Sequence, residues 1–359
     1  MQQGIDSPQT RKAPSLWKVL SGVGILLLAI VALRVYIWQK AVSEQANSLG
    51  KERPRFISPA ERDRIDKFRG YLNSLSRTDL NSIKQGETYF RRELLSLSPR
   101  GKDMAYLVFS DFYYQTSAEY NEKIMSGADL LQARLDVGNS RGLPQASYLK
   151  YLNDSTIPKS DPQIQVLMEL LFKNGFQLVL MNENYFISER PGYLYDHFGA
   201  VLSEALRTFL ELRRDDEAAD IFSSEGALHF SYRDLGERMI VWERYLDKYP
   251  DSLVGDEADY YYHTYLDTMI AGTVNLGNGN TGTANASMGS AGAGIFDERG
   301  VLKPEIKRAY YYFKSKYPNT KSGKLIDQFY DLLLHNNFKY FRQVDDFYRQ
   351  NQIKSGSGE

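Results

Sequence analysis

The sequence of 359 residues contains no cysteine, which excludes disulfide bonds, thiolate metal sites and cysteine nucleophiles. Histidine is scarce too. The four histidines are each more than twenty residues from the next, at His197, His229, His263 and His335. Because this spacing contains no paired metal-ligand motif, we expect no bound metal and no other cofactor.

No excess of positive charge marks the chain, since 44 Lys and Arg residues stand against 45 Asp and Glu residues. Residues 1–40 carry a net charge of +4, which leaves −5 on the remainder. A protein that binds nucleic acid needs clustered cations to neutralise phosphates. The mildly acidic remainder therefore predicts no nucleic-acid partner.

Complete catalytic motifs are also lacking. A G-x-G-x-x-G pattern occurs at Gly277, Gly279 and Gly282, but no strand precedes it and no helix follows it directly. Carboxylates cluster at 215–217, 256–257 and 345–346, where solvated helix ends explain them. We therefore expect no enzyme. The alternative is an envelope enzyme that acts on peptidoglycan or another glycan through carboxylates gathered around residues 176–190.

One long apolar run is present near the N-terminus, with an uncharged centre from Val19 to Leu33. As a helix, residues 16–38 extend roughly 34 Å, enough to cross a hydrocarbon core of about 30 Å. We predict a transmembrane helix at 16–38 after a tail at 1–15, with interfacial anchors at Trp17, Tyr36 and Trp38. A cleaved signal peptide is the alternative.

The remainder is expected to be mainly α-helical. A polar linker at 39–57 precedes Ser58, Pro59 and Glu61, which form a helix-start signature. Asp161 and Pro162 predict another start, and Gly175 predicts that helix's end. Residues 176–190 have the composition of one small β-hairpin, and the apolar spacing over 193–214 predicts one helix.

Two similar octapeptides stand at 248–255, KYPDSLVG, and at 316–323, KYPNTKSG. Proline stops a helix, and the polar residues that follow it can cap the next one, so each motif predicts a turn between two helices. We expect structural roles at Tyr249, Pro250, Gly255, Tyr317, Pro318 and Gly323. The match continues to Leu266 and Leu334, which are expected to face the core.

This pattern resembles the tetratricopeptide-type repeats of bacterial envelope proteins, including periplasmic partners of the Tol-Pal system and the helical lipoprotein of outer-membrane β-barrel assembly. The resemblance covers residues 233–340 and implies a protein-binding scaffold outside the cytoplasm. We expect a helical domain at 58–232 and helical hairpins at 233–350, with a flexible glycine-rich insertion at 272–294. That insertion would lengthen the connection within one helical pair. A disordered tail is expected at 351–359.

Tyrosine is abundant in the expected hairpins. Consecutive tyrosines point around a helix, so some must be exposed. We predict a partner-binding groove between helices 253–270 and 304–316, lined by Tyr261, Tyr262, Tyr311 and Tyr312. The expected protein is thus a single-pass protein of the bacterial inner membrane that binds envelope proteins. A membrane-tethered cytoplasmic adaptor is the alternative, and the oligomeric state stays open.

Overall fold

The computed structural model describes residues 57–126, 144–181, 184–219, 230–272 and 294–353, together with Leu135, Asn139 and Gly142. The expected membrane helix, with Trp17, Tyr36 and Trp38, lies outside the described residues, as do the predicted insertion over 273–293 and the last six residues. None of the helices in the described ranges is long and apolar enough to cross a membrane.

Three helices begin the described part: α2 (Pro59–Asn73), α3 (Asn81–Glu93) and α4 (Pro99–Met125). The predicted start of α2 is confirmed, because the Ser58 side chain accepts a hydrogen bond from the Glu61 amide and Glu61 bonds back to the Ser58 amide. Helix α2 packs against α4 and α3, and its residues Ile65, Phe68 and Leu72 are all buried. These buried positions repeat at helical spacing.

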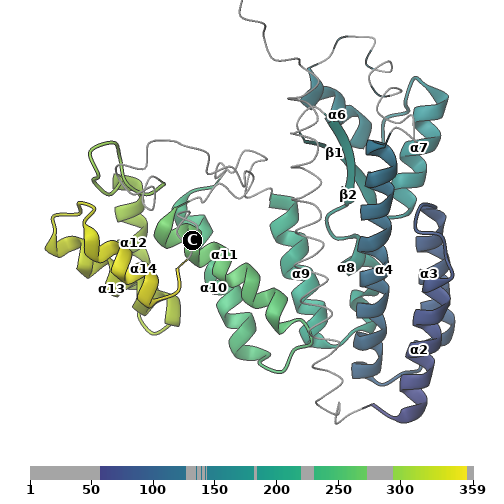
Figure 1. The fold of residues 1–359 in the computed structure, drawn as a ribbon, viewed down its shortest axis with the longest axis horizontal. Helices are drawn as coiled ribbons and strands as arrows, with labels where there is room; N and C mark the ends of the chain where they lie inside the picture. Colours follow the sequence, from purple (N-terminus) through teal and green to yellow (C-terminus); the bar gives the residue numbers. More distant parts are fainter. Residues whose placement is uncertain are drawn as a thin grey trace, which may run out of the picture. The chain divides into compact units, whose positions relative to one another are not determined.

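The predicted β-hairpin is confirmed as β1 (Phe176–Met181) paired antiparallel with β2 (Asn184–Glu189), in the register Phe176 to Glu189. The hairpin contacts α4, α6 (Gln145–Asn153) and α7 (Pro162–Lys173) (Figure 1). Asp161 caps α7 as expected, and Gly175 follows α7 at a positive φ of 80°. A hairpin alone is marginally stable, so these helices stabilise it.

The prediction of one helix over residues 193–214 is wrong. The segment divides into α8 (Tyr193–Phe198), a 3-10 turn at Gly199–Val201 and α9 (Glu204–Ala219). The amide of Ser203 donates to the buried carboxylate of Asp103 on α4, 2.9 Å away. This contact, made across 100 residues, provides a partner for an amide at the start of the second helix.

The C-terminal part contains α10 (Tyr232–Lys248), α11 (Gly255–Ala271), α12 (Pro304–Lys316), α13 (Lys321–His335) and α14 (Arg342–Gln350). The most extensive contacts among them join α10 with α11 and α12 with α13. Each octapeptide is thus the turn of one helical hairpin. The glycine-rich segment falls between the two hairpins, which corrects the expectation that it lengthens the connection inside one pair.

The described part is mainly helical, with twelve α-helices and one two-stranded antiparallel sheet. Residues Pro54–Glu359 form one compact unit, so the division at residue 232 stays a prediction. The expected disordered tail at 351–359 does not include Ile353, which is buried and whose amide donates to the Tyr348 carbonyl oxygen at 2.9 Å.

Candidate functional site

The two octapeptides have the same local structure where each preceding helix ends. Tyr249 closes α10 at φ −127° and ψ 59°, and Tyr317 closes α12 at φ −126° and ψ 45°. Both amides donate to the carbonyl four residues earlier at 2.9 Å. The prolines that follow, Pro250 and Pro318, are exposed in the turns. The prediction that each motif ends a helix is confirmed.

The two motifs differ where the next helix begins. Thr320 caps α13 as expected, because its hydroxyl accepts from the Gly323 amide at 2.9 Å. In the first copy neither Asp251 nor Ser252 is the N-cap: α11 begins after Val254, which provides no side-chain cap. Core positions differ as well, since Leu266 is 4% exposed and Leu334 is 50% exposed. The expectation that Leu334 faces the core is wrong.

The second turn is also held from outside the motif. The buried carboxylate of Glu243 on α10 accepts from the amides of Lys321 and Ser322, at 2.6 and 3.0 Å. A carboxylate at a helix N-terminus satisfies unpaired amides and interacts favourably with the helix dipole. Glu243 thereby joins the first hairpin to the second.

Three of the four predicted binding tyrosines take part in packing. The Tyr261 ring stacks on Trp242 with ring centroids 4.7 Å apart, and buried Tyr262 accepts from the Ser322 hydroxyl at 3.1 Å. Tyr312 donates to Glu237 on α10 at 2.5 Å. Moreover, α11 and α12 each pack against α10 and share few contacts with each other. These four residues therefore do not line one groove.

Tyr311 differs from those three, with 63% of its surface exposed. Helical spacing places it on one face of α12 with exposed Arg308 and Ser315. We call these three residues the α12 surface. Arg308 makes no ion pair with any residue that the structure describes, whereas Lys314 pairs with Asp327 and Asp331. The α12 surface thus offers an aromatic ring beside an uncompensated cation.

A second group of residues, all with ionisable side chains, surrounds Arg213 on α9. We call it the Arg213 cluster: Arg213, Glu189, Glu217, Glu257 and Tyr114. The guanidinium lies 3.3 Å from Glu189 and 2.6 Å from Glu217, and 4.0 Å from Glu257. Tyr114 donates to Glu189 at 2.6 Å and accepts from Arg213 at 2.6 Å. The cluster therefore connects the β-hairpin, α4, α9 and α11.

Charge in the Arg213 cluster is unbalanced, with three carboxyl groups around one cation. Burial raises the pKa of Glu189 to about 7, and the nearby Glu217 carboxylate adds to the rise, although Arg213 opposes both effects. Burial also raises the pKa of Glu257. Near neutral pH, Glu189 thus exists in both its protonated and ionised forms.

This raised pKa predicts a pH dependence of stability. In the unfolded chain Glu189 ionises near its ordinary value of 4.5, whereas in the fold it stays protonated up to about 7. The free energy of unfolding should therefore fall by about 2 to 3 kcal/mol as pH rises from 5 to 8. Urea denaturation followed by circular dichroism measures this loss. Glu189→Gln, which cannot ionise, should remove most of it, and an equal loss in the variant would contradict the assignment.

Another buried carboxylate, Glu87 on α3, behaves in the opposite way. Burial alone would raise its pKa, but hydrogen bonds from His197, Lys84 and Arg91 lower the pKa to about 2. The three donors lie 2.8 to 2.9 Å from its oxygens. Glu87 therefore remains ionised across the physiological range and fixes α8 against α3.

The expectation that the acids at 215–217 are solvated at a helix end is wrong for Asp216. Asp216 is largely buried and accepts from Trp242 Nε1 and the Tyr265 hydroxyl, both at 2.7 Å. Its partners lie 26 and 49 residues away. The only signal of this network in the sequence is the number of aromatic residues in α10 and α11.

At least two surface pockets are formed by the described residues. One, of about 390 Å³, is lined by Tyr249 and Pro250 of the first motif, and by Arg100, Asp103 and Lys248. The other, of about 340 Å³, lies against α3. No group of three or more His, Asp or Glu residues within the described ranges could hold a metal ion. Neither pocket is lined by a residue of the Arg213 cluster.

The chain was compared with protein-family models, with curated proteins and with solved structures. None of the three comparisons finds a match.

Proposed function

We propose that this protein is a membrane-anchored helical scaffold of the bacterial cell envelope, which binds an acidic segment of another protein at the α12 surface. The observation that carries this proposal is the exposure of Tyr311 one turn after Arg308, which has no ion-pair partner among the described residues. Tyr and Arg are the side chains most often responsible for binding energy at protein interfaces.

The charge of α12 favours an acidic partner. Four basic residues stand against one acidic residue over Pro304–Lys316. Two of the four already have carboxylate partners, since Lys314 binds Asp327 and Lys316 binds Glu237. Lys307 lies over the Phe338 ring, 3.4 Å from its centroid, so an incoming carboxylate would meet Arg308. An apolar neighbour in the same segment would cover the Tyr311 ring. The proposed resemblance to tetratricopeptide-type proteins agrees with such a role.

Two substitutions test this surface. Arg308→Glu and Tyr311→Ser should each lower the amount of partner recovered with the affinity-tagged protein by about tenfold or more, because each removes one of the two proposed contacts. Val166→Ser on α7 is the matched control, since Val166 is an apolar residue that is 66% exposed, close to the 63% of Tyr311. Recovery that falls equally in the control would contradict the proposal.

Thermal melting of the variants separates an effect on binding from an effect on folding. Tyr261→Ser should lower the melting temperature, because the Tyr261 ring stacks on Trp242, which is buried. Tyr311→Ser should leave the melting temperature within about 2 °C of the wild-type value, as expected for an exposed residue. A large drop for Tyr311→Ser would mean that its effect on capture reflects unfolding.

The envelope location is part of the proposal and depends on the apolar segment over residues 16–38. A reporter enzyme that is active only outside the cytoplasm, fused after Glu359, tests it directly. Activity of the reporter is the expected result. An inactive reporter with the protein present in the membrane fraction would favour the cytoplasmic adaptor.

One observation favours an enzyme as the second candidate. Glu189, at the end of the hairpin, has a pKa raised to about 7, and the Glu217 carboxyl group contacts the same Arg213 nitrogen. Glycan hydrolysis uses a pair of neighbouring carboxyl groups, of which the general acid has a raised pKa. Release of soluble fragments from peptidoglycan by the wild type, abolished by Glu189→Gln, would support this candidate over the scaffold.

A further inference from the structure

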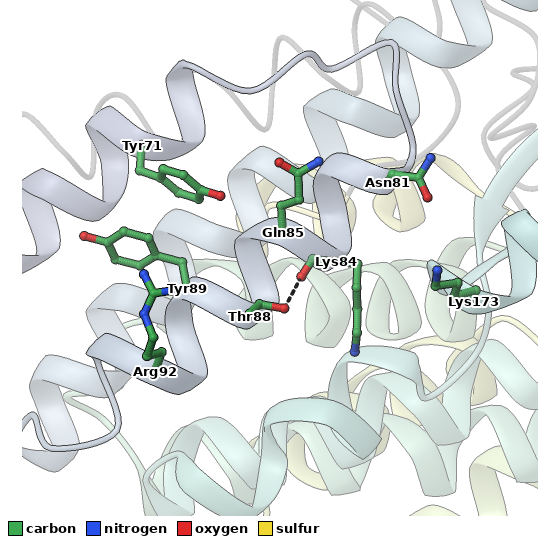
Figure 2. Close-up of a pocket in the computed structure, with 8 residues that line it drawn as sticks. All are labelled: Tyr71, Asn81, Lys84, Gln85, Thr88, Tyr89, Arg92 and Lys173. Carbon is green, nitrogen blue, oxygen red and sulfur yellow. Dashed lines mark hydrogen bonds between the residues drawn. The ribbon is translucent and has the colours of Figure 1, made fainter.

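The pocket against α3 combines features that the proposed scaffold role does not use. It has a volume of about 340 Å³, and its lining includes Tyr71 of α2, Lys173 of α7, and Lys84, Gln85, Tyr89 and Arg92 of α3. Figure 2 shows the two tyrosines and Arg92 at one end, and the two lysines toward the other. This volume is at the lower end of the usual range for small-molecule sites.

The charge of this pocket is positive. Three lining residues are cationic, of which Arg92 pairs with Glu93 at 2.6 Å, and none of the eight described lining residues is acidic. Lys84 contacts Glu87 at 2.9 Å, but Glu87 also binds Arg91 and His197, so its single charge is shared. Lys173 makes no ion pair with any residue in the described ranges. The pocket therefore attracts an anion.

The tyrosines give the other end of the pocket an amphipathic surface. Tyr71 and Tyr89 stack with ring centroids 4.6 Å apart, and Tyr89 also stacks on buried Phe68 at 5.2 Å. Because the two rings already touch, no slot remains between them for a flat nucleobase. Their half-exposed edges and hydroxyls can instead contact a ring with both apolar C–H and hydroxyl groups.

The middle of the pocket is polar and uncharged. Gln85 lies between the tyrosines and the lysines, and Thr88 lines the pocket while its hydroxyl donates to the Lys84 carbonyl oxygen at 2.7 Å (Figure 2). A side-chain amide has two donors and an acceptor, and the Thr88 oxygen can still accept. These groups suit a ligand with several hydroxyls.

From this arrangement we propose that the α3 pocket binds an anionic sugar, with its ring against Tyr71 and Tyr89 and its carboxylate or phosphate group between Lys84 and Lys173. The two kinds of anion share one chemistry here, because both accept hydrogen bonds from ammonium groups. The site uses no residue of the α12 surface, so its test is independent of the test of the proposed scaffold function.

Binding is measured by ligand-observed NMR titration of the full-length protein in detergent, with glucuronate, glucose 6-phosphate, glucose and AMP as probes. At least one anionic sugar should bind tenfold or more tightly than glucose and than AMP. The tighter of the two identifies a carboxylate or a phosphate as the natural group. Glucose binding as tightly as both anionic sugars, tighter binding of AMP, or no anionic sugar binding below about 10 mM would overturn the proposal.

Three variants localise the effect. Gln85→Glu places a carboxylate in the pocket at an exposed position and should weaken binding of the anionic sugar at least tenfold. Lys173→Gln should weaken it about fivefold, since a cation is lost. Lys67→Gln is the control, because Lys67 is an exposed α2 lysine paired with Asp63 and does not line the pocket. Unchanged binding in Gln85→Glu, with an unchanged circular dichroism spectrum, would also overturn the proposal.

Discussion

Arg213→Met should lower the free energy of unfolding by about 3 to 5 kcal/mol at pH 7, the usual cost of removing one partner from a buried charge pair. Methionine fills a similar volume but leaves Glu189 and Glu217 without their cation. Tyr114 would lose the hydrogen bond that it accepts from Arg213. The measurement is urea denaturation of wild type and variant, followed by circular dichroism.

Lower pH should rescue this variant in part. At pH 5 Glu189 is already protonated in the fold, because its pKa is about 7, so less uncompensated charge remains after the substitution. Arg214→Met is the matched control on the same helix. Arg214 contacts the exposed carboxylates of Asp215 and Glu211, and its loss should cost about 1 kcal/mol or less. Equal effects of the two substitutions would contradict the structural role of the Arg213 cluster.

Gly323→Ala should destabilise the protein by about 3 kcal/mol or more, because the added methyl group requires the second motif to rearrange. A Cβ atom at Gly323 would lie 1.8 Å from the Tyr317 carbonyl oxygen and 2.8 Å from the Thr320 hydroxyl oxygen. Both atoms belong to the turn itself, and Thr320 caps α13. Thermal melting followed by circular dichroism checks this loss.

The first motif provides the control for that substitution. Gly255 occupies the corresponding position, but a Cβ atom there would meet no atom within 4 Å. Because alanine favours helix over glycine by up to about 1 kcal/mol, Gly255→Ala should leave stability unchanged or raise it slightly. Equal melting temperatures for the two alanine variants would contradict the difference in packing between the two motifs.

Local signals in the sequence were sufficient for much of the fold. Ser58 with Glu61, and Asp161 with Pro162, identify helix starts because a cap acts on amides two or three residues away. The proline of each octapeptide identifies a helix end, because proline has no amide N–H and disfavours helical geometry at the tyrosine before it. The hairpin at 176–189 was predictable because strand composition and turn residues lie within fourteen positions.

Distant contacts account for what the sequence did not predict. The Ser203 amide at the break between α8 and α9 has its partner on Asp103, 100 residues away. The exposure of Leu334 depends on how the last hairpin packs. Of the Arg213 cluster, only Arg213 and Glu217 have a readable spacing of one helical turn. Glu189 and Glu257 reach the same guanidinium from other elements, which no spacing rule reveals.

The sequence does not show which of the four predicted binding tyrosines are exposed and which are packed. Tyr311 and Tyr312 are adjacent, yet one is exposed and the other bonds to Glu237 on α10. Adjacent helical residues point about 100° apart, so the direction of the core decides which is buried. That direction is set by the packing of α10, α12 and α13.

Photocrosslinking at position 311 in intact cells tests the central claim most directly. A photoreactive amino acid replaces Tyr311 in one strain and the similarly exposed Val166 in another. The proposed scaffold predicts one discrete crosslinked species at position 311, of a mass other than twice that of the protein, lost with Arg308→Glu and absent at position 166. No crosslink at 311, or one to a second copy of the chain, would contradict the claim that the α12 surface binds another protein.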